Sequence, residues 1–341
     1  MRKGQVRALA GATLNSLLLR PIRHRFWSGY TTPLRTHVLI THPDDELAFY
    51  KTIREMAANP AVSSSFTLLT NGTQGYEPDI HGPSRKEFAH KRENELFKSL
   101  LYAGHIFTDQ ALVDERAVYE ALIDSDPKKG FDLAQKITKH LQTILKTKQP
   151  DVLFVNDFGC GNVTHDINNY LACRTVEMLS APTNVIEYWQ GFLHAPTSDA
   201  TLENRRAYEI LGDLSYDEQG RKLRDQTPGK YDVMLEQLGI RKGRAFNGIL
   251  DIARTLHVLK TVYTSQKKSM TRLQTQSKIS YGLDTPRFRS VNISERDFTH
   301  RPWHGVQYEH TEHRLRGLER LPNFEDYKRF VHSCDTFLFK R

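Results

Sequence analysis

Short apolar runs alternate with amphipathic helical patterns along the first half of the chain. Four β-prone runs predict strands at 37–40, 66–70, 105–108 and 151–155. Between them, apolar residues recur at helical spacing over 88–102 and 131–146, which predicts two amphipathic helices. Strands that alternate with such helices are typical of βαβ units, whose parallel sheet is covered by helices on both faces. The pattern therefore predicts an α/β fold built on a mostly parallel sheet.

The hydrophobic pattern is weaker beyond about residue 200. Residues 234–263 favour a helix, and the last segment of the chain mixes short β-prone pieces with His, Arg and aromatic side chains. We therefore predict a mainly helical insertion over 200–341 that returns to the core at its C-terminal end. It follows a core at 36–199, which is preceded by a basic amphipathic segment at 1–35.

Polar clusters follow three of the predicted strands directly. The letters THPDDE come after the first strand, NGTQG after the second and NDFGCGNVTHD after the fourth. In parallel α/β sheets, ligands bind beyond the carboxyl ends of the strands. The sequence therefore predicts one functional site at this edge of the sheet.

A histidine and two adjacent carboxylates, His42, Asp44 and Asp45, lie at the end of the first predicted strand. Carboxylates this close repel each other, burial raises the penalty, and a cation relieves it. Zinc accepts His nitrogen and Asp oxygen, and catalytic zinc sites use three protein ligands. Because neighbouring residues of an extended chain point in opposite directions, we expect one Asp to bind metal and the other to act as a general base. The alternative is that one of them caps the following helix.

The third metal ligand must come from another part of the chain. The best candidate is His165, in the segment GNVTHD after the fourth predicted strand. In a parallel sheet this segment reaches the same edge as His42, so the two histidines are expected to meet there.

The motifs together resemble a known family. HPDDE after the first strand, TNG after the second, RENEL opening a helix, and Gly-x-x-x-His after a later strand resemble the PIG-L/LmbE-like zinc-dependent N-acetylglucosaminyl deacetylase family. The resemblance covers residues from about 36 to 195, and HPDDE is its most specific element. It implies a Rossmann-like three-layer α/β sandwich. It also implies a hydrolase that uses Zn²⁺ to remove N-acyl groups, mostly acetyl, from glucosamine-type sugars and their conjugates.

The resemblance also implies roles for single residues. By position, His42 and Asp45 bind zinc, and Asp44 activates the zinc-bound water. His165 is the third zinc ligand. Arg92 matches an arginine that lines the substrate side of the site in the family.

The chain departs from the family's later motif, GHPDH or GHxNH. Aligned with GNVTH, the motif's first histidine falls on Asn162 and its Asp or Asn falls on Thr164. A second register puts the first histidine on His165 and the zinc ligand on Asn168. The first register is preferred because Asn is a poor zinc ligand.

This departure has a consequence for catalysis. Asn162 can donate a hydrogen bond to an oxyanion but cannot exchange a proton at neutral pH. Losing such a group lowers the rate by about 10²–10³-fold unless another residue replaces it. Candidate replacements are the histidines His81, His304, His310 and His313. The alternative function is a catalytically degenerate member of the fold that binds sugar without cleaving it.

Composition and charge limit the other classes of protein. The chain is 38% hydrophobic and 26% charged, as in globular proteins, and no apolar run approaches the ~18 residues of a transmembrane helix. Three cysteines cannot form a disulfide framework, which favours a cytoplasmic location.

The net charge of +8 is partly local. Residues 1–35 contain seven Lys and Arg and no acid, so they are predicted to contact an anionic membrane surface, to act as a transit peptide, or to pack as a helix on the domain. Residues 241–289 are basic but contain acids and no recognisable nucleic-acid motif, so nucleic acid is not expected as a partner. The expected partner is an N-acetylated amino sugar or glycoconjugate, and the sequence does not determine the oligomeric state.

Overall fold

The computed structural model describes residues 34–73, 76, 84–158, 162–188, 262–263, 288–291, 293–299, 318, 320 and 322–340. The predicted basic segment therefore lies outside the described residues, apart from its last two positions. Most of the predicted helical insertion lies outside them as well, and so do the four candidate replacement histidines. The proposed division into three segments stays a prediction.

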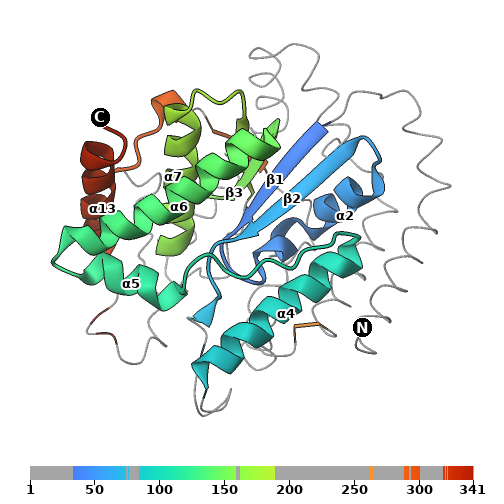
Figure 1. Ribbon diagram of the computed structural model, residues 1–341, viewed down its shortest axis with the longest axis horizontal. Coiled ribbons are helices and arrows are strands. Elements are labelled where there is room, and N and C mark those ends of the chain that lie inside the picture. The colour runs from blue at the N-terminus through green and yellow to red at the C-terminus, as the bar shows by residue number, and fades with distance from the viewer. Residues whose placement is uncertain are drawn as a thin grey trace, which may run out of the picture.

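The described part of the chain forms a five-stranded sheet with the order β2-β1-β3-β4-β5 (Figure 1). The strands are β1 (Leu34–Ile40), β2 (Val62–Leu68), β3 (Val152–Asn156), β4 (Asn184–Tyr188) and β5 (Phe288–Ser290). The first four pair in parallel, and β5 pairs with β4 antiparallel. The predicted α/β fold with a mostly parallel sheet is confirmed.

Helices cover both faces of this sheet. They are α2 (Tyr50–Ala58), α4 (Arg85–Ala103), α5 (Glu115–Ile123), α6 (Pro127–Lys148), α7 (Val163–Met178) and α13 (Phe324–Phe337), with short 3₁₀ helices η1 (Asp45–Phe49) and η3 (Ile293–Glu295). Because successive strand residues point to opposite faces, β1 contributes Val38 and Ile40 to one core cluster and Leu39 to the other. The first cluster contains apolar residues of α2 and α4, and the second contains those of α6, α7 and α13.

Two helix starts bear on the site. Helix α4 begins after Ser84, whose hydroxyl accepts a hydrogen bond from the backbone N–H of Glu87, and ends at Gly104 in the left-handed conformation (φ 99°). Helix α7 begins after Asn162, whose side chain accepts from the backbone N–H of Thr164. The second of these helices starts directly at the predicted site.

The expected strand at 105–108 is wrong. Nε2 of His105 instead donates a hydrogen bond to the carbonyl of Ile53 at 2.8 Å, and Phe107 packs against Phe66 in the core. The backbone just beyond β2 pairs with a later segment instead. There the backbone N–H of Val113 donates to the carbonyl of Leu69 at 3.0 Å. The apolar side chains in 105–108 are therefore buried from a coil segment, and this segment does not pair as a strand.

Among the elements that the hydrophobic pattern did not predict are one strand and one helix of the core. Strand β4 follows α7 and supplies the fourth parallel strand, and helix α5 lies between the coil at 105–114 and α6. Both are short, and a short apolar run alone does not distinguish a strand from a helix segment.

The C-terminal part of the chain returns to the core, as far as it is described. Helix α13 packs on α5, α6 and α7 (Figure 1), and Asp335 on α13 accepts a hydrogen bond from the hydroxyl of Tyr170 at 2.9 Å. Val262 and Tyr263 are buried in the cluster on the other face of the sheet. None of the helices in the described part of the chain is long and apolar enough to span a bilayer.

Candidate metal centre

The site lies where β1 ends and α7 begins. His42 follows β1 by two residues, Asp45 opens η1, and His165 lies in the first turn of α7. A tight turn returns the chain on itself, because the backbone N–H of Asp45 donates to the carbonyl of His42 at 3.1 Å. The Asp45 carboxylate in turn accepts from the backbone N–H of His42 at 2.8 Å. The sequence HPDD therefore places a histidine ring and a carboxylate side by side.

His42, Asp45 and His165 form a buried group whose ligand atoms, one from each residue, lie within 4.8 Å of one another. Nδ1 of His42 is 3.0 Å from Nε2 of His165 and 3.5 Å from a carboxylate oxygen of Asp45. Nε2 of His165 is 3.4 Å from the other carboxylate oxygen. Ligand atoms around one tetrahedral zinc ion, at bond lengths of ~2.0–2.2 Å, stand about 3.3–3.5 Å apart. The donor set and its spacing fit such an ion.

The electrostatics of this group favour a positive charge. Burial alone lowers the pKa of the His42 imidazole, but the carboxylates of Glu115 and Asp45 outweigh burial and raise it to about 10. Burial raises the pKa of the Asp45 carboxyl, whereas His165 and His42 hold it well below its ordinary value. The pocket therefore stabilises a cation beside an ionised carboxylate, which is the environment that a metal ion requires.

Amide side chains hold Asp45 in place. Nδ2 of Asn156, at the end of β3, donates to the Asp45 carboxylate at 3.0 Å. Oδ1 of Asn156 accepts from the hydroxyl of Thr41 at 2.5 Å and from Nδ2 of Asn168 at 3.3 Å. Asn168, the metal ligand of the second register, thus has its amide nitrogen in this network.

Asp44 lies beside the group and pairs with Arg92. The carboxylate of Asp44 is 2.8 Å from a guanidinium nitrogen of Arg92, and Arg92 also donates to the carbonyl of Gly72 at 2.5 Å. Asp44 is the residue before η1, but its side chain makes no capping hydrogen bond, so the capping alternative is wrong for Asp44. Its carboxylate instead pairs with Arg92, the arginine for which the family resemblance implies a place on the substrate side.

The turn at Asn71–Gly72, after β2, supports this arrangement. Gly72 has φ +66°, and a Cβ at this position would lie 2.5 Å from the Arg92 guanidinium and 2.6 Å from Pro43. The side chain of Asn71 accepts a hydrogen bond from the backbone N–H of Glu115 at 3.2 Å. The TNG motif therefore anchors Arg92 through a carbonyl and the start of α5 through an amide.

Asn162 of the later motif caps helix α7. Oδ1 of Asn162 accepts from the backbone N–H of Thr164 at 3.0 Å and from the Thr164 hydroxyl at 2.6 Å. The amide oxygen of Asn162 is therefore engaged in the helix start. Gly161, which precedes it, lies outside the described residues.

Sequence reasoning missed Glu115, which is fully buried at the first position of α5. Its carboxylate lies 2.8 Å from Nε2 of His42, on the side of the ring away from Asp45. No motif pointed to it, because it approaches His42 from a distant part of the chain. The only local signal was Asp114-Glu115 before an apolar pattern, which is typical of a helix start.

A buried carboxyl lies behind the HPDDE segment. Glu46 accepts hydrogen bonds from the hydroxyls of Ser99 (2.6 Å) and Tyr263, and burial raises its pKa to about 8. Tyr263 belongs to the poorly patterned second half of the chain, so part of that half packs directly behind the site.

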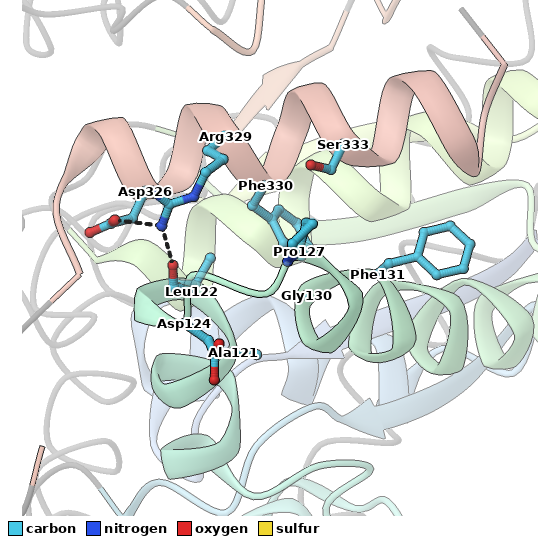
Figure 2. A pocket seen from close by; sticks show the side chains of 10 residues that line it. All are labelled: Ala121, Leu122, Asp124, Pro127, Gly130, Phe131, Asp326, Arg329, Phe330 and Ser333. Atoms are coloured by element: carbon cyan, nitrogen blue, oxygen red, sulfur yellow. Dashed lines mark hydrogen bonds and ion pairs between the residues drawn. The ribbon is translucent and has the colours of Figure 1, made fainter.

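A shallow pocket lies elsewhere, between α5, α6 and α13 (Figure 2). Arg329 crosses its rim and donates to the carbonyl of Leu122 at 3.0 Å, while Phe330 and Gly130 line its wall. It shares no residue with the His-Asp-His group, so we attribute no part of the site's chemistry to it.

Comparison with known proteins identifies the core. A family model described as "PIG-L: GlcNAc-PI de-N-acetylase" matches residues 37–176. The matched segment, which is less than half of the chain, begins in β1 and ends within α7. All six predicted site residues fall inside it, whereas α13 and β5 lie outside.

Two solved structures are distantly similar to this chain. One is the N,N'-diacetylchitobiose deacetylase from Pyrococcus horikoshii in complex with its inhibitor MPG, at 15% identity and a TM-score of 0.41, covering 76% of this chain and 84% of that one. The other is a deacetylase of the teicoplanin biosynthesis pathway, at 14% identity and a TM-score of 0.34, covering 57% of this chain and 93% of that one. No curated protein matches the chain.

Proposed function

We propose that this protein is a metal-dependent N-deacetylase, a hydrolase that removes the N-acetyl or another N-acyl group from an amino-sugar conjugate. The observation that carries the proposal is the gathering of His42, Asp45 and His165 inside the segment that matches the PIG-L model, with Asp44 next to them. The amino-sugar substrate is inferred from the family description, which names a GlcNAc-PI de-N-acetylase.

Zn²⁺ is the proposed cofactor, held by His42, Asp45 and His165. When bound, zinc supplies a Lewis acid that makes water nucleophilic near neutral pH. Nitrogen and carboxylate ligands in a small buried group suit zinc better than the all-oxygen sites of calcium or magnesium.

Asp44 is the proposed general base. It stands next to the metal ligand Asp45 in sequence but is less buried, and its carboxylate is available on the side that Arg92 occupies. It would take a proton from the attacking water and return it to the leaving amine. Arg92 would hold this carboxylate in position and help to orient the sugar on the substrate side. Asn162 would donate a hydrogen bond to the oxyanion through its amide nitrogen.

The second candidate function is a catalytically degenerate sugar-binding protein with the same fold. The observation that favours it is that Asn162, whose side chain caps α7, stands where the family motif has its first histidine. This candidate predicts sugar binding without turnover, even in metal-loaded protein.

The experiment compares metal content and turnover in protein purified without chelator. We expect about one zinc per chain in the wild type and its loss in His165→Ala. Exposed His90 on α4 provides the matched control, because His90→Ala removes a histidine without touching the group. Hydrolysis is assayed on a panel of N-acetylglucosamine conjugates by the release of acetate.

Asp44→Asn separates the two candidates. For a deacetylase it retains zinc and lowers kcat by about 10²–10⁴-fold, because it removes the general base and leaves the ligands. For a sugar-binding protein, no conjugate in the panel is turned over by the wild type. Absence of zinc from the wild type would contradict the proposed function altogether.

A cytoplasmic location and a peripheral membrane contact through residues 1–35 stay proposals. Binding of the full chain to vesicles with and without anionic lipid, measured at increasing salt, tests the contact. Electrostatic binding requires anionic lipid and weakens as salt is added.

A further inference from the structure

The two ring nitrogens of His42 face different kinds of partner. Nδ1 faces His165 and Asp45, at 3.0 and 3.5 Å. Nε2 faces the hydroxyl of Thr164 and the carboxylate of Glu115, each at 2.8 Å. In a metal-binding histidine the partner of the second nitrogen determines which nitrogen carries the hydrogen.

The hydroxyl of Thr164 has only one hydrogen, and Asn162 takes it. Oδ1 of Asn162 lies 2.6 Å from this hydroxyl and 3.0 Å from the backbone N–H of Thr164. A backbone N–H requires an acceptor, so the atom of Asn162 at this position is its oxygen, and this oxygen can only accept. The Thr164 hydroxyl therefore donates to Asn162 and presents a lone pair to His42.

Glu115 also faces Nε2. Its side chain is completely buried, and a carboxylate oxygen lies 2.8 Å from this nitrogen. A carboxylate oxygen accepts hydrogen bonds, so it favours a hydrogen on Nε2. The Thr164 hydroxyl requires that hydrogen, and the Glu115 carboxylate favours it in the same place.

We propose that Thr164 and Glu115 are positioning residues that keep the hydrogen of His42 on Nε2 and so make Nδ1 the metal-binding atom. This inference rests on the proposed function, because it assigns a ligand atom to the same metal. It assigns a structural role to each of the two residues that differ from the family motif. Asn162, as the helix cap, orients Thr164, and Thr164 orients the metal ligand.

Metal affinity is expected to fall when a hydrogen-bond partner of Nε2 is removed. Removing a hydrogen-bond partner of a metal-bound histidine typically weakens metal binding by about 10–100-fold. Removal of a buried hydroxyl with no such role should leave metal binding unchanged.

The experiment measures the zinc dissociation constant of the full chain by competition with a chelator. Thr164→Val keeps the shape of the side chain but removes the hydroxyl, and it is expected to weaken zinc binding about 10–100-fold. Thr164→Ser retains the hydroxyl and is expected to restore affinity close to that of the wild type. Glu115→Gln keeps the shape and removes the charge, and it is expected to weaken binding in the same direction.

Thr175→Val is the matched control. Thr175 lies on the same helix and is also completely buried, but its hydroxyl donates to the carbonyl of Leu171 in its own helix, at 2.6 Å. This variant reproduces the loss of a buried hydroxyl from α7 without changing the surroundings of His42, so zinc affinity should be that of the wild type.

Nitrogen-15 NMR of the zinc-loaded wild type tests the inference without any variant. We expect a hydrogen on Nε2 of His42 and none on Nδ1. A hydrogen on Nδ1, or a Thr164→Val variant that binds zinc as tightly as the wild type, would overturn the inference and leave the proposed function standing. A wild type that binds no zinc would overturn both.

Discussion

His37 and His42 are buried histidines at the middle and just beyond the end of the same strand, yet their surroundings have opposite effects. The ring of His37 is hydrogen-bonded to the hydroxyls of Ser65 and Thr67, at 2.8 and 3.1 Å. Burial, together with the positive charges of His140 and Lys148, lowers its pKa to about 3. At His42 burial acts in the same direction, but Glu115 and Asp45 reverse the result and raise the pKa to about 10.

The difference shows what turns a buried histidine into a site. Hydroxyl partners leave an imidazole neutral, because they do not offset the desolvation of a charged ring. Two carboxylates inside the same low-dielectric surroundings do offset it, because charge interactions are strong where water is absent. The middle of β1 therefore excludes a cation, and its carboxyl end attracts one.

The largest effect is expected from removing each histidine in turn. His42→Ala should abolish zinc binding and lower turnover by about 10³-fold or more, since a catalytic metal contributes several kcal/mol to the transition state. His37→Ala should retain one zinc per chain. Its free energy of unfolding is expected to fall by about 1–3 kcal/mol, because the hydroxyls of Ser65 and Thr67 each lose one hydrogen-bond partner. Metal analysis, turnover and urea unfolding measure both. Equal loss of zinc in the two variants would contradict the assignment of metal binding to His42 and not to His37.

The fall of the unfolding free energy at acid pH is expected to depend on His37. The unfolded chain binds a proton at His37 below about pH 6.5, whereas the folded protein does not until about pH 3. Stability from this histidine therefore falls as pH drops from about 6.5 to 3, by up to about 1.4 kcal/mol per pH unit. Urea unfolding of metal-free protein as a function of pH should show a shallower slope in His37→Asn.

The control for this slope is the exposed His90. Its substitution, His90→Asn, should leave the pH dependence of the unfolding free energy unchanged. His105 is also buried and has its pKa lowered to about 4, so part of the acid slope should survive in His37→Asn. A slope that is identical in His37→Asn and the wild type would contradict the environment assigned to His37.

Metal removal is expected to act through the carboxyl end of β1 alone. A ligand that binds only the folded state stabilises it by about 2.7 kcal/mol when present at 100 times its Kd. Chelation should therefore lower the Tm of the wild type and of His37→Asn by similar amounts. It should leave the Tm of His165→Ala unchanged, and differential scanning fluorimetry with and without chelator measures this.

The smallest effect is expected from restoring the family's histidine by Asn162→His. The variant loses the side-chain cap of α7, which lowers stability by about 1 kcal/mol. It also loses the acceptor of the Thr164 hydroxyl, so zinc affinity should fall as in Thr164→Val. Turnover at saturating zinc should change little, because Asp44 serves as both base and acid in the proposed reaction. Asn323→His, which removes the cap of the remote helix α13, is the control for the stability term. A large rise in turnover in Asn162→His would instead support the degenerate sugar-binding alternative.

Much of the fold and part of the site could be predicted from local patterns. HPDDE and the His165 segment follow strands whose apolar runs are visible in the sequence, so a shared edge followed from parallel pairing alone. The prediction of a strand at 105–108 was wrong because Phe107 is buried but its segment does not pair with the sheet. An apolar pattern indicates burial and does not indicate backbone hydrogen bonding. Strand β4 was missed because five residues carry too little periodicity to separate strand from helix.

The sequence by itself determined the chemistry available at the site: a histidine and two carboxylates at one strand end, a second histidine after another strand, and an arginine on a helix. Only the tertiary structure decided how that chemistry is tuned. Glu115, Asn156 and Thr164 reach His42 and Asp45 from separate elements, at distances of 2.8–3.0 Å. Such contacts depend on how α5, β3 and α7 pack around β1. No local pattern records this, because hydrogen bonds and charge interactions act through space and not along the chain.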